Sequence, residues 1–574
     1  MNSLLSAVAA LDGTVVYVYQ AMLRYAMPVL AAFLLLRTIL PLLTFRREPE
    51  IWAWLCLTNG KMLPLTHWEN VVGRSKRSDV VLDRPEVSKT HAVFTRYDDG
   101  SWTVADANSK EGILVNGQRM RICALEPDDV ITIGGIPLKF RPISKEQEIK
   151  LGKLRTRAAR PSGSIFNTIL LTVFQVLCCL SYLMTADAAV ASNIFWGFAG
   201  IVICQWLLLG FYLFIRKPSF ELENIVFFLC TLGMAAIAAV RPGETVKQLI
   251  AMVMGLALFL ALGWALRDLE RAKKLRYVAA VAGVLLLVVT LVFGKTYNGA
   301  RNWLMIGSLS IQPSELSKVC FVFIGASTLD RLVNKRNLIL FIAYTIVICA
   351  CLAIMNDFGT ALIFFAAFLI IAFLRSGSVG TIALACTSLG YAGVIALQIA
   401  PHALRRFATW RHIWEDPLNT GYQQTQALMC VASGGLFGLG AGNGMMKKLF
   451  ASDSDVVFAT IAEEWGLLMC IMAVVCIIVF GLFAIRSAAM GRSSFYTIGA
   501  CTAAGILLVQ TCFNVLGTVD VLPLTGVTMP FVSNGGSSMI CAWGLLAYVK
   551  AADTRQNASF AVRQTKEGKV KKDA

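Results

Sequence analysis

The chain has 574 residues, of which 57% are hydrophobic and only 15% are charged. Soluble domains average roughly 45–50% apolar and about 25% charged residues, so the composition excludes a soluble protein and predicts a polytopic α-helical membrane protein. The net charge of +17 does not indicate a nucleic-acid partner, because a Lys/Arg excess is the usual orientation signal of cytoplasmic loops between spans. The cysteines lie mostly in apolar runs, with no CxxC pair and no His cluster. We therefore expect neither a disulfide framework nor a metal site.

The N-terminal part is predicted to be a membrane anchor followed by a β domain. The apolar stretch within 1–48 is too long for a signal-peptide core and is followed by Arg46 and Arg47, so we expect a retained span. Residues 49–143 turn polar, and short alternating apolar runs are separated by turn residues. These runs lie at 79–82, 91–94 and 131–133. Such spacing predicts an all-β sandwich.

The rest of the chain is predicted to cross the membrane twelve more times. After a basic linker at 144–163, two additional spans occupy 164–220 and ten form a core at 221–552, before a basic tail at 553–574. The apolar runs lie near 164–184, 189–214, 224–240, 246–266, 277–293, 315–328, 338–355, 359–374, 379–399, 456–485, 495–516 and 531–549. With the anchor, we expect about 13 spans.

Basic residues between the spans predict the orientation. If the spans alternate, most Lys/Arg-rich connections fall on one side, which is then the cytoplasm. The β sandwich and the C-terminus lie on that side, whereas the N-terminus, the 400–455 loop and short turns such as 295–303 lie outside. The 400–455 loop is itself basic, against the rule, with Arg405, Arg406, Arg411, Lys447 and Lys448. We expect these charges to have another task.

The predicted sandwich resembles a forkhead-associated (FHA) domain. The motifs that carry the resemblance are GR at 73–74, SKTH at 88–91, D-x-NS at 106–109 and VNG at 115–117. The resemblance implies that Arg74 and Ser88 hold the phosphothreonine of a partner protein, that His91 is structural and that Asn116 supports the peptide loop. At 110–113, however, the chain reads KEGI where Thr/Ser-Asn-Gly-Thr is usual, and a glutamate repels a phosphate dianion. Phosphothreonine binding and a sandwich with a lost or changed ligand both remain open.

The ten-span core resembles the FtsW/RodA/SpoVE (SEDS) family. The ordered motifs are RNW at 301–303, QPSELSK at 312–318, DFGT at 357–360, WEDP at 414–417, GYQQTQ at 421–426 and SNGGSS at 533–538. The resemblance implies a peptidoglycan glycosyltransferase that polymerises lipid II into glycan strands outside the cytoplasmic membrane, during division or elongation. It also implies a partner transpeptidase, a class B penicillin-binding protein. The departures at 356–359 and 533–536 leave the branch of the family open.

The outer loop holds the predicted catalytic residue. Taken alone, an Asp directly before Pro417 is typical of a turn or a helix N-cap, but it can also be a general base that accepts the proton of an attacking sugar hydroxyl. The resemblance implies that Asp416 is the essential catalytic residue. Because the leaving group is already a pyrophosphate, one base can suffice, whereas glycosidases generally need two carboxylates. The five basic residues of the loop either neutralise the pyrophosphate or contact anionic lipid headgroups.

A second polar group is predicted inside the core. Glu315 and Lys318 lie three residues apart on a predicted span and can pair. Intramembrane charges usually face a bundle interior or a wet cavity, so the pair is either structural or lines the lipid substrate cavity. Arg301 and Asp357 lie at outer helix ends, where they either shape the cavity mouth or, for Asp357, cap a helix.

Two alternative functions remain beside the glycosyltransferase. A flippase for lipid-linked precursor would also suit a polar cavity with Glu315 and Lys318, but it has no need for Asp416. A signalling scaffold would use the FHA domain and an inactive core. No nucleotide motif is present, so no organic cofactor is expected. A divalent cation is compatible with the reaction, although no ligand set indicates one.

Overall fold

The computed structural model describes residues 13–44, 50–144, 146–147, 161–215, 219–267, 269–297, 300–306, 309–328, 335–376, 379–399, 401–489 and 493–553, except 77 and 98–99. The tail at 553–574 and the basic linker therefore lie mostly outside the described residues, as do Arg46 and Arg47.

Residues 53–142 form the predicted all-β sandwich. Its strands are β1 (Ala53–Leu57), β2 (Met62–Leu65), β3 (Glu69–Gly73), β4 (Val80–Val81), β5 (Ala92–Arg96), β6 (Trp102–Asp106), β7 (Ile113–Val115), β8 (Gln118–Met120), β9 (Ile122–Leu125), β10 (Val130–Ile133) and β11 (Ile136–Pro142). One sheet has the order β2-β1-β11-β10-β7-β8 and the other β4-β3-β5-β6-β9. Alternate side chains fill the space between them, and the rings of Trp102 and Phe140 lie 5.4 Å apart. This core is separate from the helical core, so the prediction of a β domain is confirmed.

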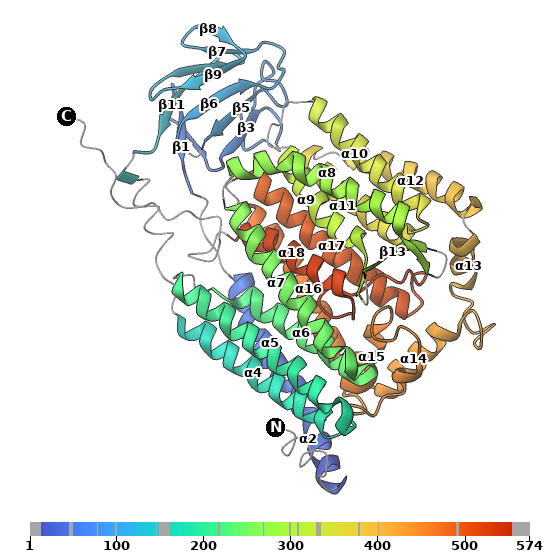
Figure 1. Ribbon diagram of the computed structural model, residues 1–574. Helices are drawn as coiled ribbons and strands as arrows, with labels where there is room; N and C mark the ends of the chain where they lie inside the picture. Colours follow the sequence, from blue (N-terminus) through green and yellow to red (C-terminus); the bar gives the residue numbers. More distant parts are fainter. Residues whose placement is uncertain are drawn as a thin grey trace.

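Three helices that flank the sandwich in sequence lie side by side against the helical core. They are α2 (Gly13–Thr44), α4 (Pro161–Leu183) and α5 (Ala188–Phe214), and α4 and α5 pack against α6 (Glu221–Val240) (Figure 1). Buried amides join them: Gln175 Nε2 donates to Gln205 Oε1 at 2.9 Å and to Thr231 Oγ1 at 3.2 Å. Buried hydrogen bonds between side chains of neighbouring helices favour one arrangement of those helices.

The remaining helices build the core and the 401–465 region. They are η1 (Pro242–Glu244), α7 (Thr245–Leu266), α8 (Leu269–Phe293), α9 (Pro313–Thr328), α10 (Lys335–Ile354), α11 (Phe358–Ser376), α12 (Val379–Ile399), α13 (Pro401–Thr409), α14 (Tyr422–Gly434), η2 (Met446–Lys448), α15 (Val457–Trp465), α16 (Leu467–Ala489), α17 (Ser494–Thr518) and α18 (Gly536–Ala551). The sandwich and α14 lie toward opposite ends of this core (Figure 1).

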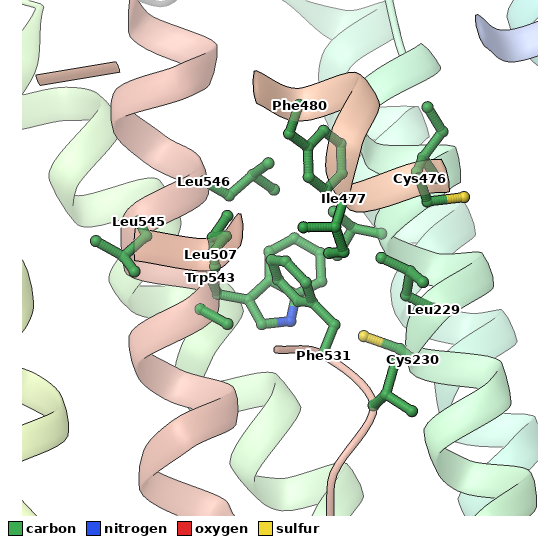
Figure 2. Packing of buried hydrophobic residues seen from close by; sticks show 14 of the residues in the cluster. Leu229, Cys230, Cys476, Ile477, Phe480, Leu507, Phe531, Trp543, Leu545 and Leu546 are labelled. Carbon is green, nitrogen blue, oxygen red and sulfur yellow. The ribbon is translucent and has the colours of Figure 1, made fainter. Parts of the chain in front are cut away.

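Trp543 of α18 lies at the centre of the helical core. Its ring approaches Phe227 at 5.4 Å, Phe259 at 5.6 Å and Phe531 at 6.1 Å. Figure 2 shows Phe531 and Phe480 in the same cluster as Trp543, and the rings of Phe480 and Phe531 meet edge to face at 6.4 Å. Because aromatic side chains each bury a large apolar area, this cluster fixes α18 against α6 and α7.

The protein is a multi-pass membrane protein, and ten of its helices within the described ranges are long and apolar enough to cross a membrane. The ten do not include α9, α12 or α18. With 16 residues each, α9 and α18 extend about 24 Å, less than a typical bilayer core of about 30 Å. The count of about 13 spans therefore stays a prediction.

Three local expectations were wrong. The continuous span predicted at 456–485 is broken at Gly466, so that α15 and α16 are separate helices. Gly466 has a φ of +86°, and a Cβ at this position would clash with the Leu436 carbonyl, so the position favours glycine. The span predicted at 531–549 begins only at Gly536. The turn predicted at 295–303 belongs to a sheet of β12 (Lys295–Tyr297), β13 (Ala300–Ile306) and β14 (Leu309–Ile311).

Candidate active site

Asp416 lies in the turn that leads into α14. Its Oδ1 accepts a hydrogen bond from Asn419 Nδ2 at 2.9 Å, and its Oδ2 accepts from the Thr420 amide at 3.2 Å and hydroxyl at 3.0 Å. An aspartate that binds its own following backbone is typical of such turns. The Thr420 amide above all, and then the Asn419 side chain, lower the pKa of the Asp416 carboxyl. The carboxylate is therefore ionised at neutral pH and fixed in orientation.

The segment around Asp416 is docked on the connection between α17 and α18. Arg406 Nη1 donates to the Thr525 carbonyl at 3.0 Å, and Trp410 Nε1 donates to the Val521 carbonyl at 3.2 Å. The amide of Arg411 donates to Asp520 Oδ1 at 3.2 Å. The structure thus attaches two of the predicted basic residues, Arg406 and Arg411, to the same loop. Arg405 lies exposed on α13 beside them.

Helix α14 connects this segment to Lys447 and Lys448. Buried side chains of α14 pack against Met446 and Leu449, which flank the two lysines. Both lysine side chains are exposed. The segment with Arg406 and Arg411 binds the connection after α17, and helix α14 binds the end of α17, because Gln424 of α14 donates to the Gly517 carbonyl at 3.1 Å.

Asp455 is a further carboxyl group in this region that the sequence did not single out as a site residue. It precedes α15, and its Oδ1 accepts from Ser454 Oγ at 3.0 Å. Burial raises the pKa of Asp455 to about 6, although the nearby charge of Arg406 opposes the shift. The signal that could have identified Asp455 was its position directly before an apolar run, but a carboxylate at a helix start is common.

Exposed apolar side chains flank Asp416. Trp414 is 60% exposed and Leu418 is 80% exposed. Aromatic side chains are enriched where membranes meet water, and large apolar groups exposed around a polar centre mark binding or membrane-contact sites. The surroundings of Asp416 thus suit a substrate with a polar head and a lipid tail.

Arg301 lies away from this cluster and closes the end of α8. Its Nε donates to the Gly294 carbonyl at 2.9 Å and its Nη2 reaches the Val292 carbonyl at 3.5 Å. A cation that binds the last carbonyls of a helix stabilises its C-terminus. Asp357 caps the start of α11, because its Oδ1 accepts from the Thr360 amide at 3.2 Å.

Glu315 and Lys318 form the predicted pair inside the helical core. Lys318 Nζ lies 2.7 Å from Glu315 Oε1, and the side chains are only 1% and 7% exposed, respectively. Their helix, α9, packs against α8, α17 and α18. The pairing is as expected from the sequence, whereas its assignment to a substrate cavity stays a prediction.

The sandwich brings Arg74 and Ser88 together at one end. The Arg74 amide donates to the Ser88 carbonyl at 3.0 Å, and the Arg74 side chain is exposed. His91 is fully buried, accepts from the Ser88 amide at Nδ1 and bonds the Gly112 carbonyl through Nε2, a structural role. Asn116 donates to Asp129 and accepts from the Val130 amide, so it orders the turn between β7 and β8.

Among the residues that the structure describes, no group of three or more His, Cys, Asp or Glu side chains could hold a metal ion. The candidate site consists of one ordered carboxylate, surrounding cations and exposed apolar side chains. Such a site can accept a proton and stabilise a leaving anion.

Comparisons with known proteins match both parts of the chain. The sequence signature of the FtsW/RodA/SpoVE cell cycle proteins matches residues 240–558, and that of the FHA domain matches residues 70–134. The "Probable peptidoglycan glycosyltransferase FtsW" of Wigglesworthia glossinidia brevipalpis is 30% identical over 50% of this chain and 77% of its own length. The "Peptidoglycan glycosyltransferase RodA" of Mycobacterium bovis is 29% identical over 52% and 68%. A solved chain described under "Structural coordination of polymerization and crosslinking by a peptidoglycan synthase complex" aligns with 27% identity over 57% of this chain and 96% of that chain, at a TM-score of 0.48.

Proposed function

Because the chain belongs to the FtsW/RodA/SpoVE family of cell cycle proteins, we propose that it is a peptidoglycan glycosyltransferase that polymerises lipid II into glycan strands. The names of its relatives support this activity over a flippase or a scaffold. The observation that carries the proposal is Asp416, held ionised by three hydrogen bonds in a segment rich in cations.

Asp416 acts as the general base of the reaction. A carboxylate has about four acceptor sites, so three donors leave one for the 4-hydroxyl of the acceptor sugar. As Asp416 takes that proton, the hydroxyl oxygen bonds to the anomeric carbon of the donor sugar. The bond from that carbon to the pyrophosphate oxygen breaks, and its electron pair leaves with the lipid pyrophosphate.

The basic residues of the outer segments stabilise the leaving group. The Arg406 guanidinium is held on the Thr525 carbonyl, Arg411 is bound to Asp520 through its backbone amide, and Lys447 and Lys448 lie exposed next to α14. Cations held in place before the reaction stabilise developing negative charge without reorganisation. Trp414 and Leu418 contact the apolar part of the lipid substrate.

The orientation and the partners form part of the same proposal. The outer segments face the outside of the cytoplasmic membrane, and the sandwich and the C-terminus face the cytoplasm, in agreement with the distribution of basic residues between the spans. A class B penicillin-binding protein cross-links the product strands. The FHA domain binds a phosphothreonine-containing protein through Arg74 and Ser88, with Asn116 supporting the peptide loop, and so regulates the location or activity of the enzyme.

Polymerisation of purified lipid II by the detergent-solubilised protein, with and without its transpeptidase, tests the activity. Asp416→Asn is expected to lower kcat by a factor of at least about 100, as for loss of a general base, with a small effect on KM. Glu415→Gln is the matched control, since Glu415 is the neighbouring carboxylate and is 76% exposed.

Polymer from the Asn variant at the wild-type rate would remove Asp416 as the base. No polymer from the wild type in the presence of the partner would contradict the glycosyltransferase and favour lipid translocation, which a vesicle flipping assay measures.

A further inference from the structure

The C-terminal end of α4 makes a buried polar contact with α15. Tyr182 Oη donates to Glu464 Oε2 at 2.6 Å and accepts from Trp465 Nε1 at 2.9 Å. Tyr182 and Glu464 are 2% and 4% exposed. The other carboxylate oxygen, Glu464 Oε1, accepts from the amide of Gly442 at 3.2 Å. Tyr182 is thus connected through one carboxylate to the loop that precedes Lys447 and Lys448.

Helix α2 and the end of α4 hold the same loop at further points. Gln20 Nε2 donates to the Ala441 carbonyl at 3.1 Å, and Gln20 Oε1 accepts from Asn443 Nδ2 at 2.8 Å. A Cβ at Gly442, where φ is +77°, would lie 2.6 Å from Thr185 Oγ1. Both helices therefore contact the backbone of the loop closely.

On its other side the loop is held by α15. Glu463 accepts from the amides of Met445 at 2.8 Å and Met446 at 2.9 Å, directly before the two lysines. The loop contains glycines at 438, 440, 442 and 444, and glycine backbone loses more conformational freedom on ordering than any other residue. Its conformation therefore depends on these contacts with neighbouring helices.

We propose that Tyr182 and Gln20 are positioning residues: the N-terminal helices α2 and α4 fix the 437–448 loop and thereby place Lys447 and Lys448 at the pyrophosphate of the lipid substrate. Both helices lie outside the residues that match the family, 240–558. This assignment rests on the proposed glycosyltransferase for its effect on substrate, whereas its effect on the loop stands independently of any activity.

Tyr182→Phe tests the proposal, with Tyr212→Phe as the matched control. Tyr212 is likewise a buried tyrosine that donates to a buried glutamate, Glu223, at 2.9 Å. This contact lies at the C-terminal end of α5, whereas Tyr182 lies just before the start of α5. Both substitutions keep the ring and remove one hydroxyl that donates to a buried glutamate, and Tyr182→Phe also removes the acceptor of Trp465 Nε1. Hydrogen exchange of the full-length protein is measured on peptides covering 437–448, together with KM and kcat for lipid II.

Tyr182→Phe is expected to speed exchange in 437–448 and to raise KM by about tenfold, the size expected when a hydrogen bond to a charged group is lost, with a smaller change in kcat. Tyr212→Phe should leave exchange in that loop and KM unchanged. If Tyr182 acts through the lysines, its KM effect disappears when Lys447 and Lys448 are both replaced by Ala.

Unchanged exchange in 437–448 would overturn the proposal whatever the activity. Equal losses in both Tyr variants, or a KM effect that persists without the lysines, would also overturn it, because the role of Tyr182 would then be general stability. If the wild type makes no polymer but Tyr182→Phe loosens the loop, the proposed function fails while the placement of the loop by α2 and α4 stands.

Discussion

Two carboxyl groups of the outer segments have pKa values shifted in opposite directions by their surroundings. Hydrogen bonds from Thr420 and Asn419 lower the pKa of Asp416, whereas burial raises that of Asp455 to about 6. Hydrogen bonds that favour the charged form and burial that disfavours it are distinct causes. Asp416 is consequently the carboxylate that is ionised throughout the neutral pH range, as a base requires.

Asp455 makes stability depend on pH. Its pKa in the folded protein is above the ordinary value of 3.8, so between about pH 4 and 6 the folded state holds more protons than the unfolded state, and stability falls as the pH rises. Because one pKa unit corresponds to about 1.4 kcal/mol, ionisation of Asp455 lowers the free energy of unfolding at pH 7 by at most roughly 3 kcal/mol.

Asp455→Asn removes this titration while keeping the shape of the side chain. It should raise Tm at pH 7 and change it little at pH 4, which thermal unfolding of the detergent-solubilised protein measures at both values. An equal gain at the two pH values would show that the carboxyl group is not the cause.

At the scale of elements, polar side chains fix how helices pack. Lys550 of α18 binds Glu223 of α6 at 2.9 Å with both side chains fully buried, and Glu315 and Lys318 pair within α9. Burying two charges costs several kcal/mol per ion, and their mutual attraction offsets only part of this cost. Removal of one partner leaves an unpaired buried charge, so it destabilises the protein more than replacement of both.

The pair in α9 provides the test. Glu315→Gln or Lys318→Met alone leaves one buried charge and should destabilise the protein by about 3–5 kcal/mol, whereas the double variant Glu315→Leu with Lys318→Met should recover most of the loss. Chemical or thermal unfolding in detergent measures this. Polymerisation by the stable double variant then separates the two roles: recovery indicates a structural pair, and continued loss indicates contact with substrate.

At the scale of the whole molecule, the FHA sandwich and the outer segments lie toward opposite ends of the helical core (Figure 1). Glu69 of β3 accepts a hydrogen bond from Ser494 at the start of α17. The sandwich lies between α2 and α4 in the sequence, and these helices contact the outer loop through Gln20 and Tyr182. The chain thus connects the FHA domain with both helices that hold the loop.

Arg74→Ala in the full-length protein should weaken binding of phosphothreonine peptides by more than about tenfold, because charge-assisted hydrogen bonds to phosphate are lost. Fluorescence anisotropy with a phosphothreonine peptide library measures this, and the unphosphorylated peptides serve as a control. Arg141→Ala is the matched control for Arg74→Ala, since Arg141 is also an exposed arginine of the sandwich. Arg141 lies on β11 and pairs with Asp128. Equal binding by wild type and Arg74→Ala would contradict the assignment.

Local patterns were sufficient for much of the fold. Apolar length predicted the membrane helices, alternation predicted strands at β5 and β10, and ordered motifs led to the FHA domain and the FtsW/RodA/SpoVE family. The same patterns failed at Gly466, where a positive φ breaks an apolar run, and at 295–303, where a short segment pairs with its neighbour as β strands. In both places a local conformation overrides composition.

By itself the sequence determined the membrane class, the two-part organisation and the family, because these depend on composition and on motifs of residues close together in the chain. The resemblance to that family is what pointed to Asp416 as the candidate base. Only the tertiary structure decided which distant groups meet. It showed Arg301 closing α8, Arg406 on the Thr525 carbonyl and Tyr182 on Glu464, 282 residues away. Hydropathy is a property of each segment alone, whereas a buried hydrogen bond depends on which segments become neighbours.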